Sequence, residues 1–216
     1  MPVVLAALTG CGAAATPGAA VRVGEERVSS AEVAEAARDI CTLSEEQLQS
    51  GSQVVPMSLM RTRAVELLTL GAMGRQIAEE YGIEMDQAYQ EQLASVEQAA
   101  QSLPESAQDT FVELSAAIAF TQAVEREVGR LSLVEDGVTD PGVDDQDARG
   151  KEVFVRWADE NGVSINPRYG VGFVDGAVVA VPTDTSFAVS DTALAGLAEE
   201  VDVEAARSLP AAQRCG

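Results

Sequence analysis

Few residues of this 216-residue chain could carry covalent or metal chemistry. There is no histidine, which excludes Ser-His and Cys-His nucleophile pairs, a histidine general base and every histidine-ligated metal site. The three cysteines, Cys11, Cys41 and Cys215, are too widely spaced for a CxxC redox motif or a zinc cluster. Carboxylate, tyrosine, lysine and arginine chemistry remains, but no pair of carboxylates is distinct from the acidic background. We therefore expect no catalytic residues, no metal site and no cofactor.

Cys11 follows a short apolar segment. Residues 2–9 are too few to cross a bilayer as a helix, and they suit the end of the hydrophobic region of a signal peptide. The segment ends in LTGC, which resembles the bacterial lipobox, in which an aliphatic residue and two small residues precede the cysteine that is acylated. This resemblance implies a signal peptide over residues 1–10, a lipid anchor on Cys11 and a flexible spacer over residues 11–20, which are small and contain Pro and Gly.

One observation keeps an alternative to the lipid anchor open. No Lys or Arg precedes the apolar run, so either the true start lies upstream of Met1 or the segment is not a signal peptide. The alternative is a buried N-terminal strand that ends at the Gly-Cys-Gly sequence around Cys11.

The other two cysteines, Cys41 and Cys215, suggest an extracytoplasmic location independently of the lipobox. A leftover pair outside the cytoplasm is expected to form a disulfide bond. Cys215 is the penultimate residue, where an unpaired thiol would be reactive and where little else holds the chain. We therefore predict a Cys41–Cys215 disulfide, with two unrelated free thiols as the alternative.

The composition is strongly acidic. With 35 Asp and Glu against 14 Lys and Arg, the formal net charge is −21. Such a surface repels nucleic-acid phosphates and anionic lipid headgroups, so we expect no nucleic-acid partner and no membrane binding through a basic patch. The chain is 46% hydrophobic but only 4% aromatic, which favours helices packed through small residues.

The N-terminal part of the folded region has a strand–turn–strand pattern. Residues 20–29 alternate between apolar and polar types around Gly24, which predicts two short strands. Ser29 or Ser30 then caps a helix in which Glu32 completes a capping box. Residues 42–53 are polar, and we interpret them as a connection with at most a helical turn.

Three amphipathic segments follow, each roughly 20 to 27 residues long and joined by short turns, which predicts antiparallel helices. The first runs from about Pro56 to Gly82, and we expect another backbone to pass close to Gly71 and Gly74 within it. The second begins near Asp86. The third follows a turn before Pro104, with an inward stripe of Phe111, Leu114, Ile118, Val124, Val128 and Leu131.

An acidic stretch, residues 136–147, does not fit an EF-hand frame, and we interpret it as a solvated loop rather than a calcium site. A fourth helix is expected to end at Asn161, and a short returning strand covers residues 163–166. From residue 171 the chain becomes a predicted hairpin with a turn at Asp175-Gly176, followed by an Ala-rich, acidic and extended C-terminal tail that we expect to lie over the bundle.

This order of elements resembles the chaperone domain of the SurA and PrsA family of extracytoplasmic foldases. The resemblance rests on VRVGEERVSSAEV (residues 21–33) and on the long helix RTRAVELLTLGAMGRQIAEEYGI (residues 61–83). NGVSINPRYG (residues 161–170) and the ending SLPAAQRCG are similar to actinobacterial lipoproteins that carry a SurA-type N-terminal domain. The resemblance implies a mainly α fold over residues 21–170, an antiparallel bundle in which the N-terminal strands pair with the strand near residues 163–166.

The resemblance also shows what the chain lacks. In the full foldases a parvulin prolyl-isomerase domain interrupts the last bundle helices, but here the corresponding gap is the short acidic loop. The histidines typical of a parvulin site are absent as well. The resemblance thus implies a chaperone half without prolyl isomerase catalysis, in a protein anchored to the extracytoplasmic face of the cell membrane.

Four methionines suggest how such a bundle would bind clients, because the flexible methionine side chain adapts to many apolar shapes. We predict a client-binding groove lined by Met57, Met60, Met73, Met85 and Tyr89. The alternative is that these side chains form the core between helices. The surrounding negative charge would favour cationic clients.

Two functions remain open from the sequence. In one, the protein holds unfolded or exported polypeptides. In the other, it is a structural or assembly lipoprotein that binds one dedicated cell-envelope partner.

Overall fold

The computed structural model describes residues 18–181 and 202–216. Cys11, the predicted signal peptide and most of the predicted spacer lie outside these residues, as does the central part of the C-terminal tail. The described elements are β1 (Ala19–Val23), β2 (Glu26–Ser29), α1 (Ser30–Ser50), β3 (Val55–Pro56), α2 (Met57–Tyr81), α3 (Gln87–Ala100), α4 (Glu105–Glu135), α5 (Val143–Asn161), β4 (Val163–Ile165), the 3₁₀ turn η1 (Pro167–Tyr169), β5 (Val171–Val174), β6 (Ala177–Ala180), α7 (Val203–Ser208), the 3₁₀ turn η2 (Ala211–Gln213) and β7 (Arg214–Cys215).

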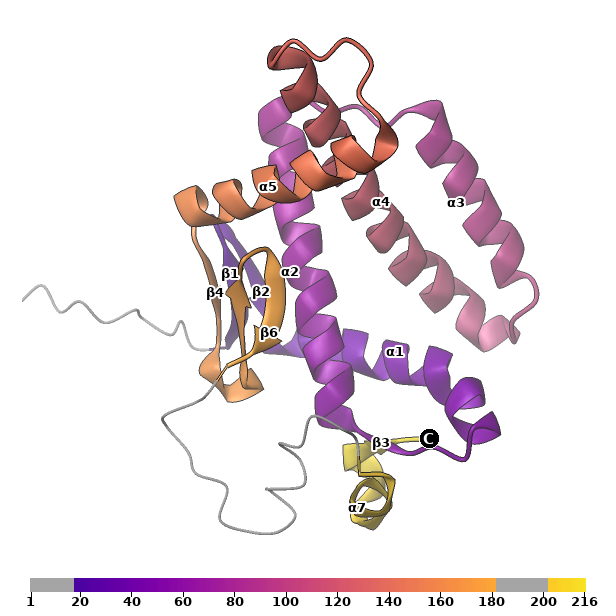
Figure 1. The fold of residues 1–216 in the computed structure, drawn as a ribbon. Coiled ribbons are helices and arrows are strands. Elements are labelled where there is room, and N and C mark those ends of the chain that lie inside the picture. Colours follow the sequence, from indigo (N-terminus) through magenta and orange to yellow (C-terminus); the bar gives the residue numbers. More distant parts are fainter. Residues whose placement is uncertain (1–17, 182–201) are drawn as a thin grey trace, which may run out of the picture.

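The predicted mainly α fold class is confirmed. Helix α2 runs through the middle of the molecule, with α1, α4 and α5 packed around it and three small antiparallel sheets at its sides (Figure 1). Its fully buried residues are mostly small, among them Ala64, Val65 and Ala72, so its neighbours approach closely. Among the described residues, no helix combines the length and hydrophobicity that a bilayer span requires.

The N-terminal prediction is confirmed in detail. Strand β1 pairs with β2 on one side and with β4 on the other, in the order β2-β1-β4, so the returning strand does meet the first one. Ser29 caps α1. Its side-chain hydroxyl accepts a hydrogen bond from the backbone N–H of Glu32, and the Glu32 carboxylate accepts one from the backbone N–H of Ser29, as a capping box requires. At the β1–β2 turn Gly24 has a φ of 52°, and a Cβ there would lie 2.6 Å from the Gln76 side chain of α2.

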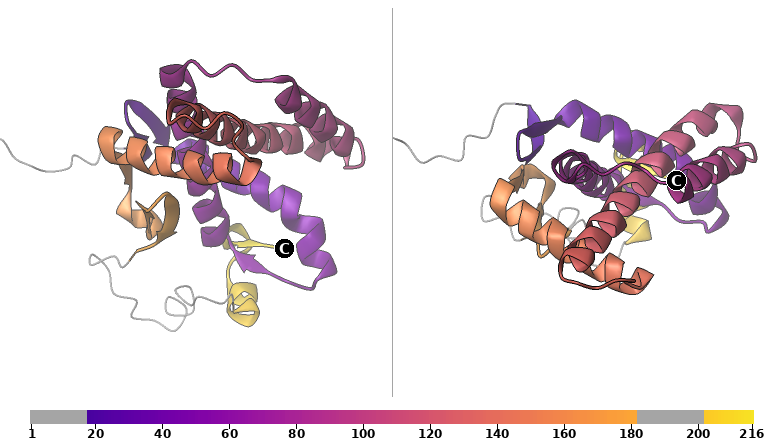
Figure 2. Two further views of the ribbon diagram at one scale, coloured as in Figure 1. Left: turned by 45° about the horizontal axis from the view of Figure 1, so that its top comes forward. Right: turned by 90° about the horizontal axis from the view of Figure 1, so that it is seen from above.

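Two predictions about the helices are wrong. The first concerns residues 42–53, because α1 continues without a break to Ser50 and only a short connection leads to β3. The second concerns helix length, since α3 has 14 residues and α4 has 31. Helix α3 packs along α4, and Figure 2 shows α3 and the beginning of α4 on the side of the molecule away from strands β1, β2 and β4.

Helices α4 and α5 cross at a pair of glycines. A Cβ built on Gly129 would lie 2.0 Å from the carbonyl oxygen of Gln146, and one built on Gly150 would lie 2.0 Å from the carbonyl oxygen of Glu125. The two backbones therefore touch. The close approach predicted at Gly71 is absent, since a Cβ there would meet only Arg75 Nη1 at 3.5 Å, an ordinary contact. At Gly74 the neighbour is the Thr121 Cα of α4, at 3.6 Å.

The C-terminus is attached to the start of the bundle. The sulfur atoms of Cys41 and Cys215 lie 2.08 Å apart across a sequence separation of 174 residues. Strand β7 pairs with β3, and Arg207 of α7 donates a 2.7 Å hydrogen bond to the carbonyl oxygen of Ser52. The predicted hairpin is confirmed as β5 and β6, which pair around Asp175 and Gly176. The tail is less extended than predicted, since it contains α7 and η2.

The glycine crossing leads to a first prediction. Gly129→Ala and Gly150→Ala should each lower the free energy of unfolding by about 1–3 kcal/mol or more, because backbone atoms cannot move aside as side chains do. Urea unfolding followed by far-UV circular dichroism measures this. The matched control is Gly71→Ala, which should raise stability by up to about 1 kcal/mol because alanine favours the helix and meets no close neighbour. Equal effects of all three substitutions would contradict the crossing.

The disulfide leads to a second prediction. Replacing both Cys41 and Cys215 by Ser should lower the unfolding temperature and the free energy of unfolding. The chain-entropy model limits the loss of free energy to roughly 5 kcal/mol for so long a loop. Thermal unfolding with and without a reductant provides the comparison. The reductant should destabilise the wild type and leave the double variant unchanged. A wild type indifferent to the reductant would contradict the covalent link.

Candidate functional site

A groove lies between α1 and α4 on one face of α2. It consists of two adjoining cavities of about 500 and 310 Å³ that share Arg63, Leu67, Leu114 and Ile118. Both α1 and α4 pack against α2, so α2 supplies the floor and the other two helices supply the walls. We call these two cavities together the groove.

The smaller cavity is the apolar end of the groove. Ile40 and Leu43 from α1 face Phe111 and Leu114 from α4, with Leu103 closing one side. All five side chains are half-buried, so each leaves apolar surface in contact with water. A ligand that covers this surface gains about 25 cal/mol for each Å² it removes from water.

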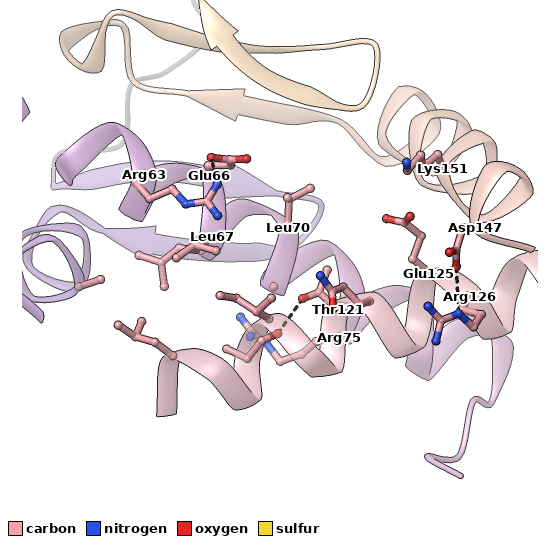
Figure 3. Close-up of a pocket in the computed structure, with 17 residues that line it drawn as sticks. Arg63, Glu66, Leu67, Leu70, Arg75, Thr121, Glu125, Arg126, Asp147 and Lys151 are labelled. Carbon is pink, nitrogen blue, oxygen red and sulfur yellow. Dashed lines mark hydrogen bonds and ion pairs between the residues drawn. The ribbon is translucent and has the colours of Figure 1, made fainter. Parts of the chain in front are cut away.

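The larger cavity is the polar end, where α5 joins the walls. Leu68, Leu70 and Gly71 of α2 lie beneath it, and charged side chains surround it in Figure 3. Most of these charges are already paired within the protein. Arg63 contacts Glu66 at 2.5 Å, Arg126 contacts Asp147 at 3.0 Å, and Arg75 pairs with Glu26 of β2.

Two charged side chains at the polar end differ from the others. In the part of the chain that the structure describes, neither Glu125 nor Lys151 has an ion-pair or hydrogen-bond partner for its side chain. Burial raises the pKa of Glu125, and the opposing effect of Lys151 lowers it.

The charge of the groove differs from that of the whole chain. Four basic residues line the larger cavity, Arg63, Arg75, Arg126 and Lys151, against three acidic ones, Glu66, Glu125 and Asp147. The chain as a whole has 14 basic and 35 acidic residues. The excess of acid is therefore carried by the outer surface, and the interior of the groove is close to electrically balanced.

The predicted methionine surface is not this groove. Met57 and Met60 are each only 8% exposed, and Met73 is fully buried. Met85 packs against the same core, and Tyr89 makes an edge-to-face contact with Phe120 at 6.4 Å between ring centroids. None of the five lines either cavity. Met57, Met60 and Met73 thus belong to the core, as the alternative had it, and Met85 packs against it, so these residues do not form the methionine-lined groove that the sequence predicted.

Sequence reasoning placed one wall of the groove correctly and missed the other. Phe111, Leu114 and Ile118 belong to the predicted inward stripe of α4. Only its later members, Val124 and Val128, reach the core, and the earlier ones line the groove. The wall formed by α1 was missed because residues 42–53 were interpreted as a connection. Leu43 and Leu48, spaced among polar residues, were the available signal for a longer helix.

Neither chemistry nor similarity identifies the site further. Among residues 18–181 and 202–216, no group of three Cys, Asp or Glu side chains is placed to hold a metal ion. Comparisons with protein-family models, with curated proteins and with solved structures find no match for this chain.

Proposed function

We propose that this protein is a membrane-anchored extracytoplasmic lipoprotein that holds unfolded or exported polypeptide segments in the groove, without prolyl isomerase catalysis. The observation that carries the proposal is the groove itself, an open apolar cleft flanked by helices with a polar end. An unfolded chain offers apolar side chains next to polar main-chain groups, which is the same combination. The sequence resemblance to SurA-type domains and the pairing of β1 with β4 support it.

The site of client binding changes from the sequence-based hypothesis. Leu67, Leu114 and Ile118 line both cavities, and in this proposal they replace the methionines as the central contacts with the client. The balanced charge inside the groove favours uncharged apolar segments, whereas the net charge of −21 acts at longer range and keeps the protein soluble.

Client binding is tested by aggregation. A chemically denatured exported protein, diluted into buffer, should scatter less light when the wild-type protein is present in several-fold molar excess. Leu114→Gln should lose most of this suppression, because it places an amide where both cavities need apolar surface. The matched control is Val143→Gln, which makes the same kind of change at a 56% exposed site outside the groove and should retain full suppression.

The aggregation assay also separates the two functions left open by the sequence. Absence of suppression by the wild type at several-fold excess rejects the chaperone proposal. If Val143→Gln loses suppression of aggregation as fully as Leu114→Gln does, the client binds outside the groove. Suppression of a single envelope protein and of no other client would instead identify a dedicated assembly partner.

The lipid anchor has its own test. Protein purified from membranes should begin at Cys11, and its N-terminal peptide should carry the added mass of a lipid. Cys11→Ser should abolish both the processing and the added mass, because it removes the thiol that is acylated. A mature N-terminus at another residue with no lipid mass would reject the anchor, whatever the groove binds.

A further inference from the structure

The polar end of the groove contains two side chains of opposite charge that have no ion-pair or hydrogen-bond partner among the described residues. Glu125 lies on α4 and Lys151 on α5, and both line the larger cavity. Figure 3 shows the two side chains at the same end of the cavity, and the electrostatic effect of Lys151 on Glu125 agrees with this placement. Nearby Arg126 forms its ion pair with Asp147, and Arg75 forms its ion pair with Glu26.

The glycine crossing holds Glu125 in position. A Cβ on Gly150 would lie 2.9 Å from the Glu125 Cγ, so the side chain passes directly over the bare backbone of α5. Lys151 is the next residue along α5. The close contact between the backbones of α4 and α5 therefore places the acceptor Glu125 beside the donor Lys151. Both residues lie on helices and not on flexible loops.

The two charges discriminate among classes of ligand. An anionic group, such as a lipid phosphate or a fatty-acid carboxylate, would meet Lys151 but also the Glu125 carboxylate, on a protein of net charge −21. A cationic side chain would meet Glu125 but also Lys151. A neutral group with a donor and an acceptor can bind both, and each residue of an extended main chain presents one N–H and one C=O to the same side.

We propose that Glu125 and Lys151 bind the main chain of one residue of an extended segment held in the groove, Glu125 accepting from the N–H of that residue and Lys151 donating to its C=O. This inference rests on the proposed function and specifies its ligand: a segment with an unblocked main-chain amide at the polar end and uncharged apolar side chains toward Phe111 and Leu114. Hydrogen bonds to charged groups are the stronger ones, so the main chain supplies affinity that does not depend on the client sequence.

The direct test uses two peptides that differ only in their backbone. A fluorescently labelled peptide of Leu, Ala, Ser and Asn with blocked ends is compared with its backbone N-methylated counterpart by fluorescence anisotropy. The wild type should bind the first peptide about tenfold or more tightly than the second, because N-methylation removes the donors for Glu125. If neither peptide binds, the proposed function itself fails. If both bind equally, the function stands and the main-chain contact is rejected.

Variants of the two side chains make the test specific. Glu125→Ala and Lys151→Met should each weaken binding of the unmethylated peptide about tenfold, whereas Glu125→Gln should stay within about threefold of the wild type because its amide oxygen still accepts. A cation-binding site would instead lose affinity fully with Glu125→Gln, and that result overturns the inference. Glu113→Gln and Arg156→Met remove equal charges from the same two helices outside the groove and should leave binding unchanged. Thermal unfolding of every variant confirms that it is folded.

Discussion

The contact between the backbones of α4 and α5 at Gly129 and Gly150 determines much of what surrounds it. Two helices normally keep their axes 8–10 Å apart because side chains lie between them, and only glycines permit backbone atoms to meet. Once α5 is fixed against α4, Trp157 reaches α2, where its indole N–H donates a 2.7 Å hydrogen bond to Glu80. The chain leaving α5 then delivers β4 to β1. The small sheet and the polar end of the groove thus both depend on one close contact.

The parts of the fold that the sequence predicts best are those decided by neighbouring residues. Ser29 and Glu32 form the capping box from positions three residues apart, and Gly82 ends α2 with a left-handed φ of 61°. The β5–β6 hairpin is likewise local, since a two-residue turn fixes its register. The pairing of β1 with β4 is long-range, and it was expected because the family resemblance implied it.

The groove was harder to predict because it exists where two helices fail to meet. Leu114 and Val124 fall on one stripe of α4, and periodicity assigns both to the interior in the same way. Val124 is fully buried in the core, whereas Leu114 is only partly buried and lines both cavities of the groove. The methionine content was likewise a poor predictor of where the groove lies. The flexible side chain of Met73 would suit an adaptable binding surface, but Met73 lies where α2 is enclosed by its neighbours.

The arrangement of charge is compatible with the proposed binding of apolar segments by an acidic chain. Placing the acid excess in the groove would have left carboxylates unpaired near apolar surface, which is costly when water is excluded. The larger cavity avoids this by matching nearly every acid with a base, and burial raises the pKa of Glu125, which has no such partner among the described residues. A bound segment that donates to Glu125 would relieve that cost, whereas an empty groove leaves it to partial hydration. Under the proposed function, the cost of holding this carboxylate poorly solvated would therefore favour a ligand with a polar main chain over one that is apolar throughout.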